Sequence, residues 1–174
     1  MLIDGMNSGY ITEVTTKGND QDTTIKKILI AIDESEHRGK IIRYGLTLAK
    51  SLGAVVTVAH VIDRSSVTAL GDLGGLLGYY ESGNRVYERE LTKHAKEFLS
   101  EAESLAKKQG IKINVHVIMN ASSIAEGIID YASSTKMDLI VIGTKGKTGG
   151  HKFLVGGIAN KIIDHAHCPV LAVR

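Results

Sequence analysis

Five short apolar runs, separated by segments of helical periodicity, constrain the fold of this chain more than any other feature. The runs are rich in β-branched residues, as are strands that are buried on both faces of a sheet. They read KKILIAID (26–33), AVVTVAHVI (54–62), INVHVIM (113–119), DLIVIG (138–143) and PVLAVR (169–174). Strands that alternate with helices predict right-handed βαβ units and therefore a parallel sheet.

The segments between these runs have the patterns of helices. Residues 37–52 place apolar side chains at helical spacing, and a long amphipathic helix follows a glycine-rich loop at 65–83. Ser122 or Ser123 is expected to cap the next helix, and residues 157–166 form a short last helix. The sequence therefore predicts a single open, doubly wound α/β domain with helices on both faces of the sheet.

The ends and the composition of the chain restrict its class further. Residues 1–24 are polar and dotted with glycine, which predicts an N-terminal arm ahead of a domain at 25–174. Lys plus Arg exceed Asp plus Glu by only 21 − 19 = 2, so we expect no nucleic-acid or membrane partner. An 18-residue apolar run and a signal-peptide pattern are both missing, and a cytoplasmic location is the expectation. The single Cys168 excludes an internal disulfide.

The stretch IGTKGKTGGHKFLVGGIAN (142–160) concentrates glycine after the fourth run. Gly146, Lys147 and Thr148 look like the end of a Walker A phosphate loop. That motif needs a glycine five positions before Gly146, and this chain has Val141 there. A dinucleotide fingerprint would need Gly-x-Gly-x-x-Gly, which no glycine here begins. The stretch is neither of these two motifs.

The spacing of the glycines still suits a phosphate site. Gly143 ends the fourth strand, Gly146 lies three residues on, and Gly156 and Gly157 open the last helix. Glycine lets backbone N–H groups approach an anion closely, and a helix N-terminus adds unpaired N–H groups and a positive dipole end. The alternative is that these glycines only form two turns and a close helix–strand contact. Spacing alone leaves both interpretations open.

This pattern resembles the Gly-x-x-Gly-(nine residues)-Gly-Ser/Thr signature of the universal stress protein family. The resemblance extends over roughly residues 25–174 and includes KKILIAID, VAHVID, DLIVIGTKGKTG and HAHCPVLAVR. It implies a five-stranded parallel sheet of order 3-2-1-4-5, usually in a dimer. For the ATP-binding members it also implies a nucleotide, with or without Mg²⁺, at the ends of the first, second and fourth strands.

Carried over by position, the resemblance places Asp33 and Val61 near the adenine and ribose. The full set expected to bind the nucleotide is Ile32, Asp33, Val61, Ile142, Gly143, Gly146, Lys147, Gly156, Gly157 and Ile158. A carboxylate at Asp33 suits ribose hydroxyls or the adenine amino group, and it equally suits the N-cap of the following helix. Val61 either presents backbone groups to the base or is a core residue. Lys147 and Lys152 either neutralise phosphates or are simply solvated.

Two positions depart from the family pattern. Gly157 stands where Ser or Thr is usual, which removes a hydroxyl expected to bond phosphate but leaves the backbone N–H. We therefore expect weaker ATP binding or a different ligand. Asn120 replaces a glycine that is usual after the third strand, and asparagine tolerates left-handed backbone geometry.

The leading hypothesis is a nucleotide-binding stress protein that acts as a sensor or scaffold. The sequence shows no Ser-His-Asp, Cys-His or paired-carboxylate arrangement, so slow metal-assisted ATP hydrolysis is the most that we expect. The alternative, which Gly157 favours, is a dimeric interaction module that binds no nucleotide. For both, the apolar run PVLAVR predicts a strand at the sheet edge that pairs with a second copy in a homodimer.

Overall fold

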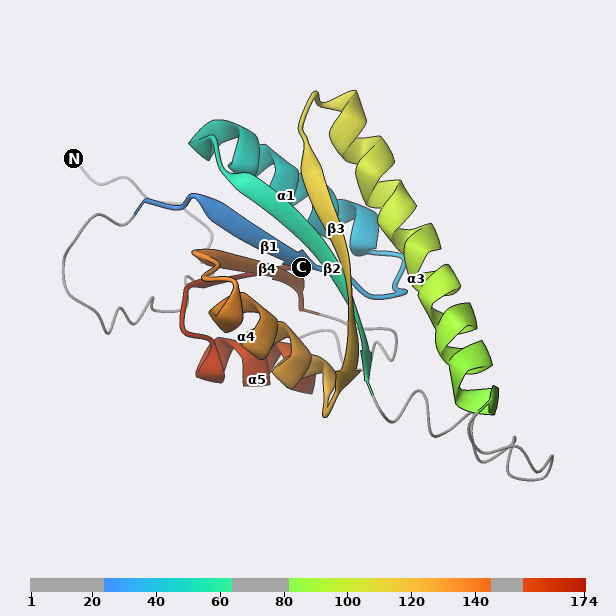
Figure 1. Ribbon diagram of the computed structural model, residues 1–174. Helices are drawn as coiled ribbons and strands as arrows, with labels where there is room; N and C mark the ends of the chain where they lie inside the picture. Colours follow the sequence, from blue (N-terminus) through green and yellow to red (C-terminus); the bar gives the residue numbers. More distant parts are fainter. Residues whose placement is uncertain (1–23, 64–81, 145–154) are drawn as a thin grey trace, which may run out of the picture.

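The computed structural model describes residues 24–63, 82–144 and 155–174, and Figure 1 shows how they are arranged. One parallel sheet has five strands in the order β3-β2-β1-β4-β5, which confirms the expected topology. The strands are β1 (Lys27–Ala31), β2 (Val55–Asp63), β3 (Ile113–Ala121), β4 (Leu139–Gly143) and β5 (Val170–Val173). The helices are α1 (Arg38–Leu52), α3 (Ser82–Lys108), α4 (Ile124–Ser134) and α5 (Gly157–His165).

Helices cover both faces of the sheet, with α1 and α3 on one face and α4 and α5 on the other (Figure 1). In the central strand β1, Ile28 and Ile30 pack on the side of α1 and α3, whereas Leu29 and Ala31 pack on the side of α4 and α5. Successive side chains of a strand point to opposite faces. A central strand between two helical layers therefore needs an unbroken apolar run, which the first run supplies.

Two helices approach the sheet at a glycine. A Cβ built on Gly45 of α1 would lie 2.7 Å from Ile30 Cγ1 and closer still to Ile30 Cδ1. A Cβ built on Gly127 of α4 would lie 2.8 Å from Ala121 Cβ and 2.9 Å from Val61 Cγ1. Carbon atoms do not pack this closely, so only glycine allows the two helices to lie at these distances from the sheet.

Local signals set the helix ends. Of the two candidate caps for α4, Ser123 is the N-cap, and its hydroxyl accepts a hydrogen bond from the Glu126 N–H at 3.2 Å. The predicted loop at 65–83 extends too far, because α3 already begins at Ser82. Helix termini tolerate glycine better than helix interiors do. The rest of that loop and the predicted N-terminal arm, except Thr24, lie outside the described residues.

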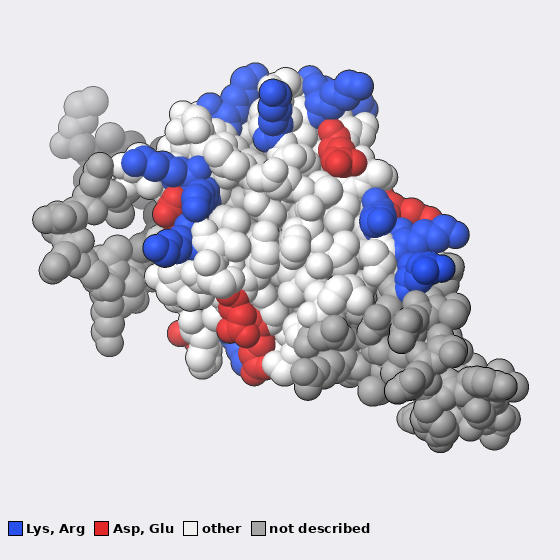
Figure 2. All heavy atoms as spheres, in the orientation of Figure 1, with Lys and Arg blue, Asp and Glu red and all other residues white. Residues whose placement is uncertain are grey.

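Positive charge gathers at the ends of two helices. In Figure 2, lysines and arginines cluster over the C-terminal turns of α1 and α3. Lys50 lies in the last turn of α1, and Lys107 and Lys108 lie in the last turn of α3. A cation at this end of a helix is favoured by the helix dipole. Within the described ranges, none of the helices has the length and the apolar character needed to cross a membrane.

Candidate functional site

Asp33 follows β1 at the centre of the sheet. Its side chain is half-buried, and its Oδ1 accepts a hydrogen bond from the Ser35 N–H at 3.1 Å. The N-cap of α1 is His37, which makes no side-chain cap bond, so the N-cap role considered for Asp33 is wrong. The physical reason is that the chain turns once more before the helix begins, and Asp33 stabilises that turn instead. Its Oδ2 takes no part in the turn.

Three apolar candidates at this end of the sheet have core side chains. Ile32, Val61 and Ile142 are only 5%, 7% and 4% exposed. Each can therefore offer a ligand little besides its backbone. The Ile32 N–H donates to the Ala59 carbonyl at 2.9 Å, and alternate residues of a parallel strand face the same neighbour. The N–H and C=O of Val61 consequently face the β1 side, at the level where β1 has ended.

Thr144, directly after Gly143, joins the end of β4 to the start of α5. Its N–H donates to the Val173 carbonyl at 2.9 Å, and its own carbonyl accepts from the Gly156 N–H at 2.9 Å. A Cβ built on Gly156 would lie 3.4 Å from that carbonyl oxygen. Gly156 is thus both the N-cap of α5 and a close helix–strand contact. The sequence interpretation missed Thr144, and its position beside Gly143 was the available signal.

The first residues of α5 are open. Among the described residues, no atom lies within 4 Å of a Cβ built on Gly157, and Ile158 is 47% exposed. Gly156 has extended backbone angles and, as a glycine, has no side chain to cap the first amides of the helix. These amides and the positive end of the helix dipole together form a surface that favours an anion.

Contacts between α4 and α5 fix the direction of α5. Lys161 Nζ donates to Glu126 Oε1 at 2.8 Å, and the Ser122 hydroxyl bonds to the same carboxylate. The hydrogen bonds from Lys161 and Ser122, together with the Lys161 charge, lower the pKa of Glu126. Because this pair lies at the surface, we expect it to orient α5 more than to stabilise the fold.

The described candidates converge on one end of the sheet. All five strands are parallel, and β1 pairs with β2 on one side and with β4 on the other. The order of the strands therefore reverses at β1, and ligands of open α/β sheets bind beyond the carboxyl ends at such a point. Figure 1 shows the N-terminus of α5 at this end, beyond β4.

Part of the expected site falls in the segment 145–154. Gly146 and Lys147, together with the neighbouring Lys152, lie outside the described residues. A separate hollow of about 350 Å³ lies between Lys50 and Lys112, at the amino-terminal end of the sheet, and does not belong to this site. Within the described part of the chain, His, Cys, Asp and Glu side chains form no group of three or more suited to a metal ion.

These features define an open α/β protein with a carboxylate and a glycine-opened helix at its topological switch point. The sequence model of the universal stress protein family matches residues 24–174, and the chain belongs to this family.

Individual relatives agree with this assignment. Universal stress protein MJ0531 of Methanocaldococcus jannaschii is 32% identical over 149 residues, which cover 86% of this chain and 82% of the relative. The solved structure of the hypothetical protein MJ0577 aligns with a TM-score of 0.70 at 23% identity, over 86% of this chain and 96% of the other. The universal stress protein of Archaeoglobus fulgidus in complex with dAMP aligns with a TM-score of 0.59 at 22% identity. The alignment covers 87% of this chain and 99% of the other. At these identities the two structures show the fold alone.

Proposed function

We propose that this protein binds an adenine nucleotide, ATP with or without Mg²⁺, and acts as a sensor or scaffold in the cytoplasmic stress response. The observation that carries the proposal is the contact between Gly156 and Thr144. It brings the N-terminus of α5 to the end of β4, and no other described residue fills the space beside Gly157. Free amides and an open helix start are the elements that bind phosphate groups in proteins.

The remaining groups suit the nucleoside. A ribose diol donates two hydroxyl protons, and the Asp33 Oδ2, outside the local turn, is an acceptor for them. Adenine presents an amino donor beside a ring-nitrogen acceptor. These two groups complement the backbone C=O and N–H of Val61, which face the β1 side where β1 has ended. The dAMP named in the Archaeoglobus fulgidus structure supports an adenine nucleotide as the class of ligand.

Binding without rapid turnover is the role that these residues support. The residues at the site supply hydrogen-bond acceptors and amides, and a bound Mg²⁺ would neutralise phosphate charge. Gly157 favours the second candidate, an interaction module of the same family, because it lacks the hydroxyl that the family signature places there. Nucleotide released from the denatured protein and identified by ion-exchange chromatography separates the two candidates.

Mg-ATP at a hundredfold excess over Kd is expected to stabilise the protein by about 2.7 kcal/mol, since a ligand of the folded state stabilises by RT ln(1 + [L]/Kd). Asp33→Ala should reduce the increase in Tm that Mg-ATP produces, because it removes the proposed ribose acceptor. Differential scanning calorimetry with and without nucleotide measures both effects.

Asp138→Ala is the matched control. The Asp138 Oδ2 accepts the N–H groups of Lys26 and Lys27 at 2.9 and 2.8 Å, at the opposite end of the sheet. This variant should lose stability but keep its full response to Mg-ATP. If millimolar adenine nucleotide leaves the transition of the unaltered protein in place, the interaction-module candidate replaces the nucleotide-binding one.

We further propose that the protein is a homodimer that pairs through β5. This strand lies at the edge of the sheet, and three of its four residues are only partly buried. The Ile140 N–H donates to the Pro169 carbonyl and the Thr144 N–H donates to the Val173 carbonyl. By the alternation of a parallel ladder, the N–H groups of Val170 and Ala172 therefore face outward, away from β4. An edge of unpaired N–H and C=O groups favours pairing with a second chain.

Val170→Lys and Ala172→Pro are both expected to shift the dimer toward monomer. The first adds like charges across the two-fold axis, and the second removes an outward N–H without breaking the ladder to β4. Val115→Lys, on the opposite edge strand β3, should leave the dimer intact. Light scattering on the eluting peak measures the mass, and a clean monomer of the unaltered protein at tens of micromolar rules out this proposal.

A further inference from the structure

The loop that carries Asp33, residues 32–37, is held at three of its carbonyl oxygens by side chains. His60 Nδ1 lies 3.0 Å from the Ile32 carbonyl oxygen. Because a carbonyl only accepts, this nitrogen carries the proton and donates it. Arg38 Nη1 donates to the carbonyls of Ser35 at 3.3 Å and Glu34 at 3.4 Å. The loop on both sides of Asp33 is thereby attached to β2 and to the start of α1.

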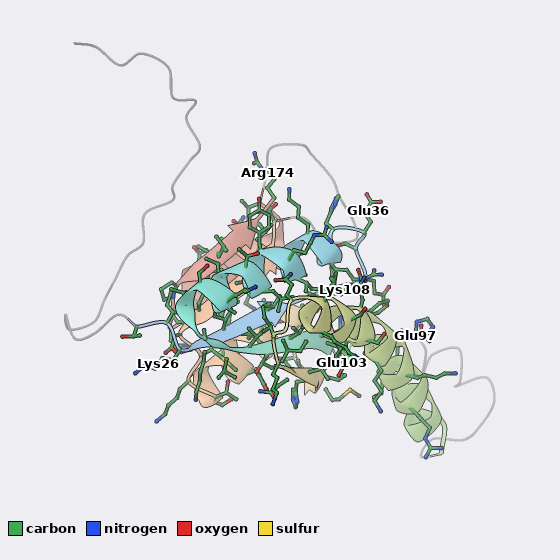
Figure 3. The ribbon with its side chains drawn as sticks, turned by 90° about the horizontal axis from the view of Figure 1, so that it is seen from above. Lys26, Glu36, Glu97, Glu103, Lys108 and Arg174 are labelled. Carbon is green, nitrogen blue, oxygen red and sulfur yellow. The ribbon has the colours of Figure 1, made fainter. Side chains whose placement is uncertain are left out.

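Both of these side chains rest on one aromatic ring of α3. The His60 ring lies 5.6 Å from the Phe98 ring between centroids, at an interplanar angle of 59°. The Arg38 guanidinium lies 5.1 Å from the same centroid, in cation–π geometry. Figure 3 shows α1 and α3 beside each other, with Glu36 ahead of α1 and Glu97 on α3. Glu97 directly precedes Phe98 in the sequence.

A carboxylate of α3 completes the arrangement. Arg38 Nε donates to Glu101 Oε2 at 2.6 Å, and both side chains are partly buried. A Cβ built on Gly39 would lie 3.1 Å from Glu101 Oε1, so glycine at this position leaves room for the carboxylate. The guanidinium is thus fixed by an ion pair as well as by the ring, and it cannot leave the loop carbonyls without losing both.

One polar side chain of the loop has no partner of its own within the described part of the chain. Ser35 is only 7% exposed, and its hydroxyl has no hydrogen-bond partner among the described residues. A buried hydroxyl without a partner is unfavourable. The conformation around Asp33 rests on the internal bond from the Ser35 N–H and on the bonds that His60 and Arg38 donate to the loop carbonyls.

We propose that His60, Arg38 and Phe98 form a clamp that positions Asp33 for the nucleotide. This inference rests on the proposed function. His60 and Arg38 are positioning residues, since they hold the backbone of the loop and act on a ligand only through the Asp33 carboxylate. The Ser35 N–H bond to Asp33 Oδ1 transmits the position of the loop to that carboxylate.

A double-mutant cycle with Asp33 tests the clamp. His60→Leu removes the donor at similar volume and should weaken Mg-ATP binding about tenfold, the effect of one hydrogen bond. His60→Asn places an amide N–H near the Nδ1 position and should restore most of the affinity. In the Asp33→Ala background, His60→Leu should have no further effect. Calorimetric titration measures Mg-ATP binding by the unaltered protein and these four variants, and additive losses in the double variant overturn the inference.

A second readout needs no nucleotide. In the free protein, His60→Leu and Arg38→Met should each accelerate hydrogen exchange of the Ser35 amide about tenfold, since each removes a bond that holds the loop. Ser123→Ala, which removes the cap of α4, is the control and should leave this amide unchanged. Unchanged Ser35 exchange in both clamp variants overturns the clamp alone. If the unaltered protein does not bind Mg-ATP, the proposed function is overturned. The proposed role of the clamp in nucleotide binding is then overturned as well.

Discussion

Gly45→Ala is expected to destabilise the protein by about 1–2 kcal/mol. The new Cβ would lie 2.7 Å from Ile30 Cγ1, and Ile30 is fully buried, so one of the two elements must shift. Overpacking of this kind costs roughly 1–3 kcal/mol, and the better helix propensity of alanine offsets up to about 1 kcal/mol. Chemical denaturation measures the change in the free energy of unfolding.

Two further variants separate this collision from a general effect of alanine. The double variant Gly45→Ala/Ile30→Val lacks the Cδ1 atom and should recover part of the lost stability, although Ile→Val alone costs about 0.5–1.5 kcal/mol. Gly157→Ala adds a Cβ that has no described atom within 4 Å, and this variant should be close to neutral. A Gly45→Ala protein as stable as the unaltered chain would contradict the close approach of α1 to β1.

Gly157→Ser is expected to tighten Mg-ATP binding by about 1 kcal/mol, or several-fold in Kd. The family signature has a hydroxyl at this helix-opening position. A hydrogen bond to a charged group is worth roughly 1.5–3 kcal/mol, and ordering of the new side chain offsets part of it. Among the described glycines, positive φ angles occur at Gly53 and Gly110 and not at Gly157. Serine should therefore enter without backbone strain.

Calorimetric titration with Mg-ATP and Mg-ADP tests this expectation, and Gly157→Ala separates the hydroxyl from the added Cβ. Tighter binding of ATP with little change for ADP would place the hydroxyl beside the terminal phosphate. Equal affinities of the serine variant and the unaltered protein, both folded, would show that the start of α5 does not hold phosphate.

Most of the fold could be predicted from the sequence because its signals are local. The run at 26–33 is apolar at successive positions, which is how a strand between two helical layers must read. The N-cap of α4 is an interaction within one helical turn, so the sequence limits the candidates for it to two adjacent serines. The start of α3 was placed too late because the glycine in its first turn resembles a loop residue.

The site could be predicted only in part. Its residues are distant in sequence, and only the order of the strands in the sheet brings them together. Asp33 suited both a helix cap and a ligand by residue type, and only the extra turn before α1 removes the cap role. From the sequence, Val61 suited both a position in the core and a contact with the base of a ligand. Its side chain packs against α4 at Gly127 while its backbone faces the β1 side, so the two interpretations apply to different atoms of one residue.

The sequence by itself determined the alternation of strands and helices and, through the glycine pattern, the family and the order of the strands. Periodicity and turn chemistry act over a few residues, so they can be read along the chain. Only the tertiary structure decided that Gly156 packs on Thr144 and that His60 and Arg38 meet on Phe98. These residues lie 12 to 60 positions apart in sequence, and contacts at such separations exist only once strand order, register and helix packing have brought the segments together.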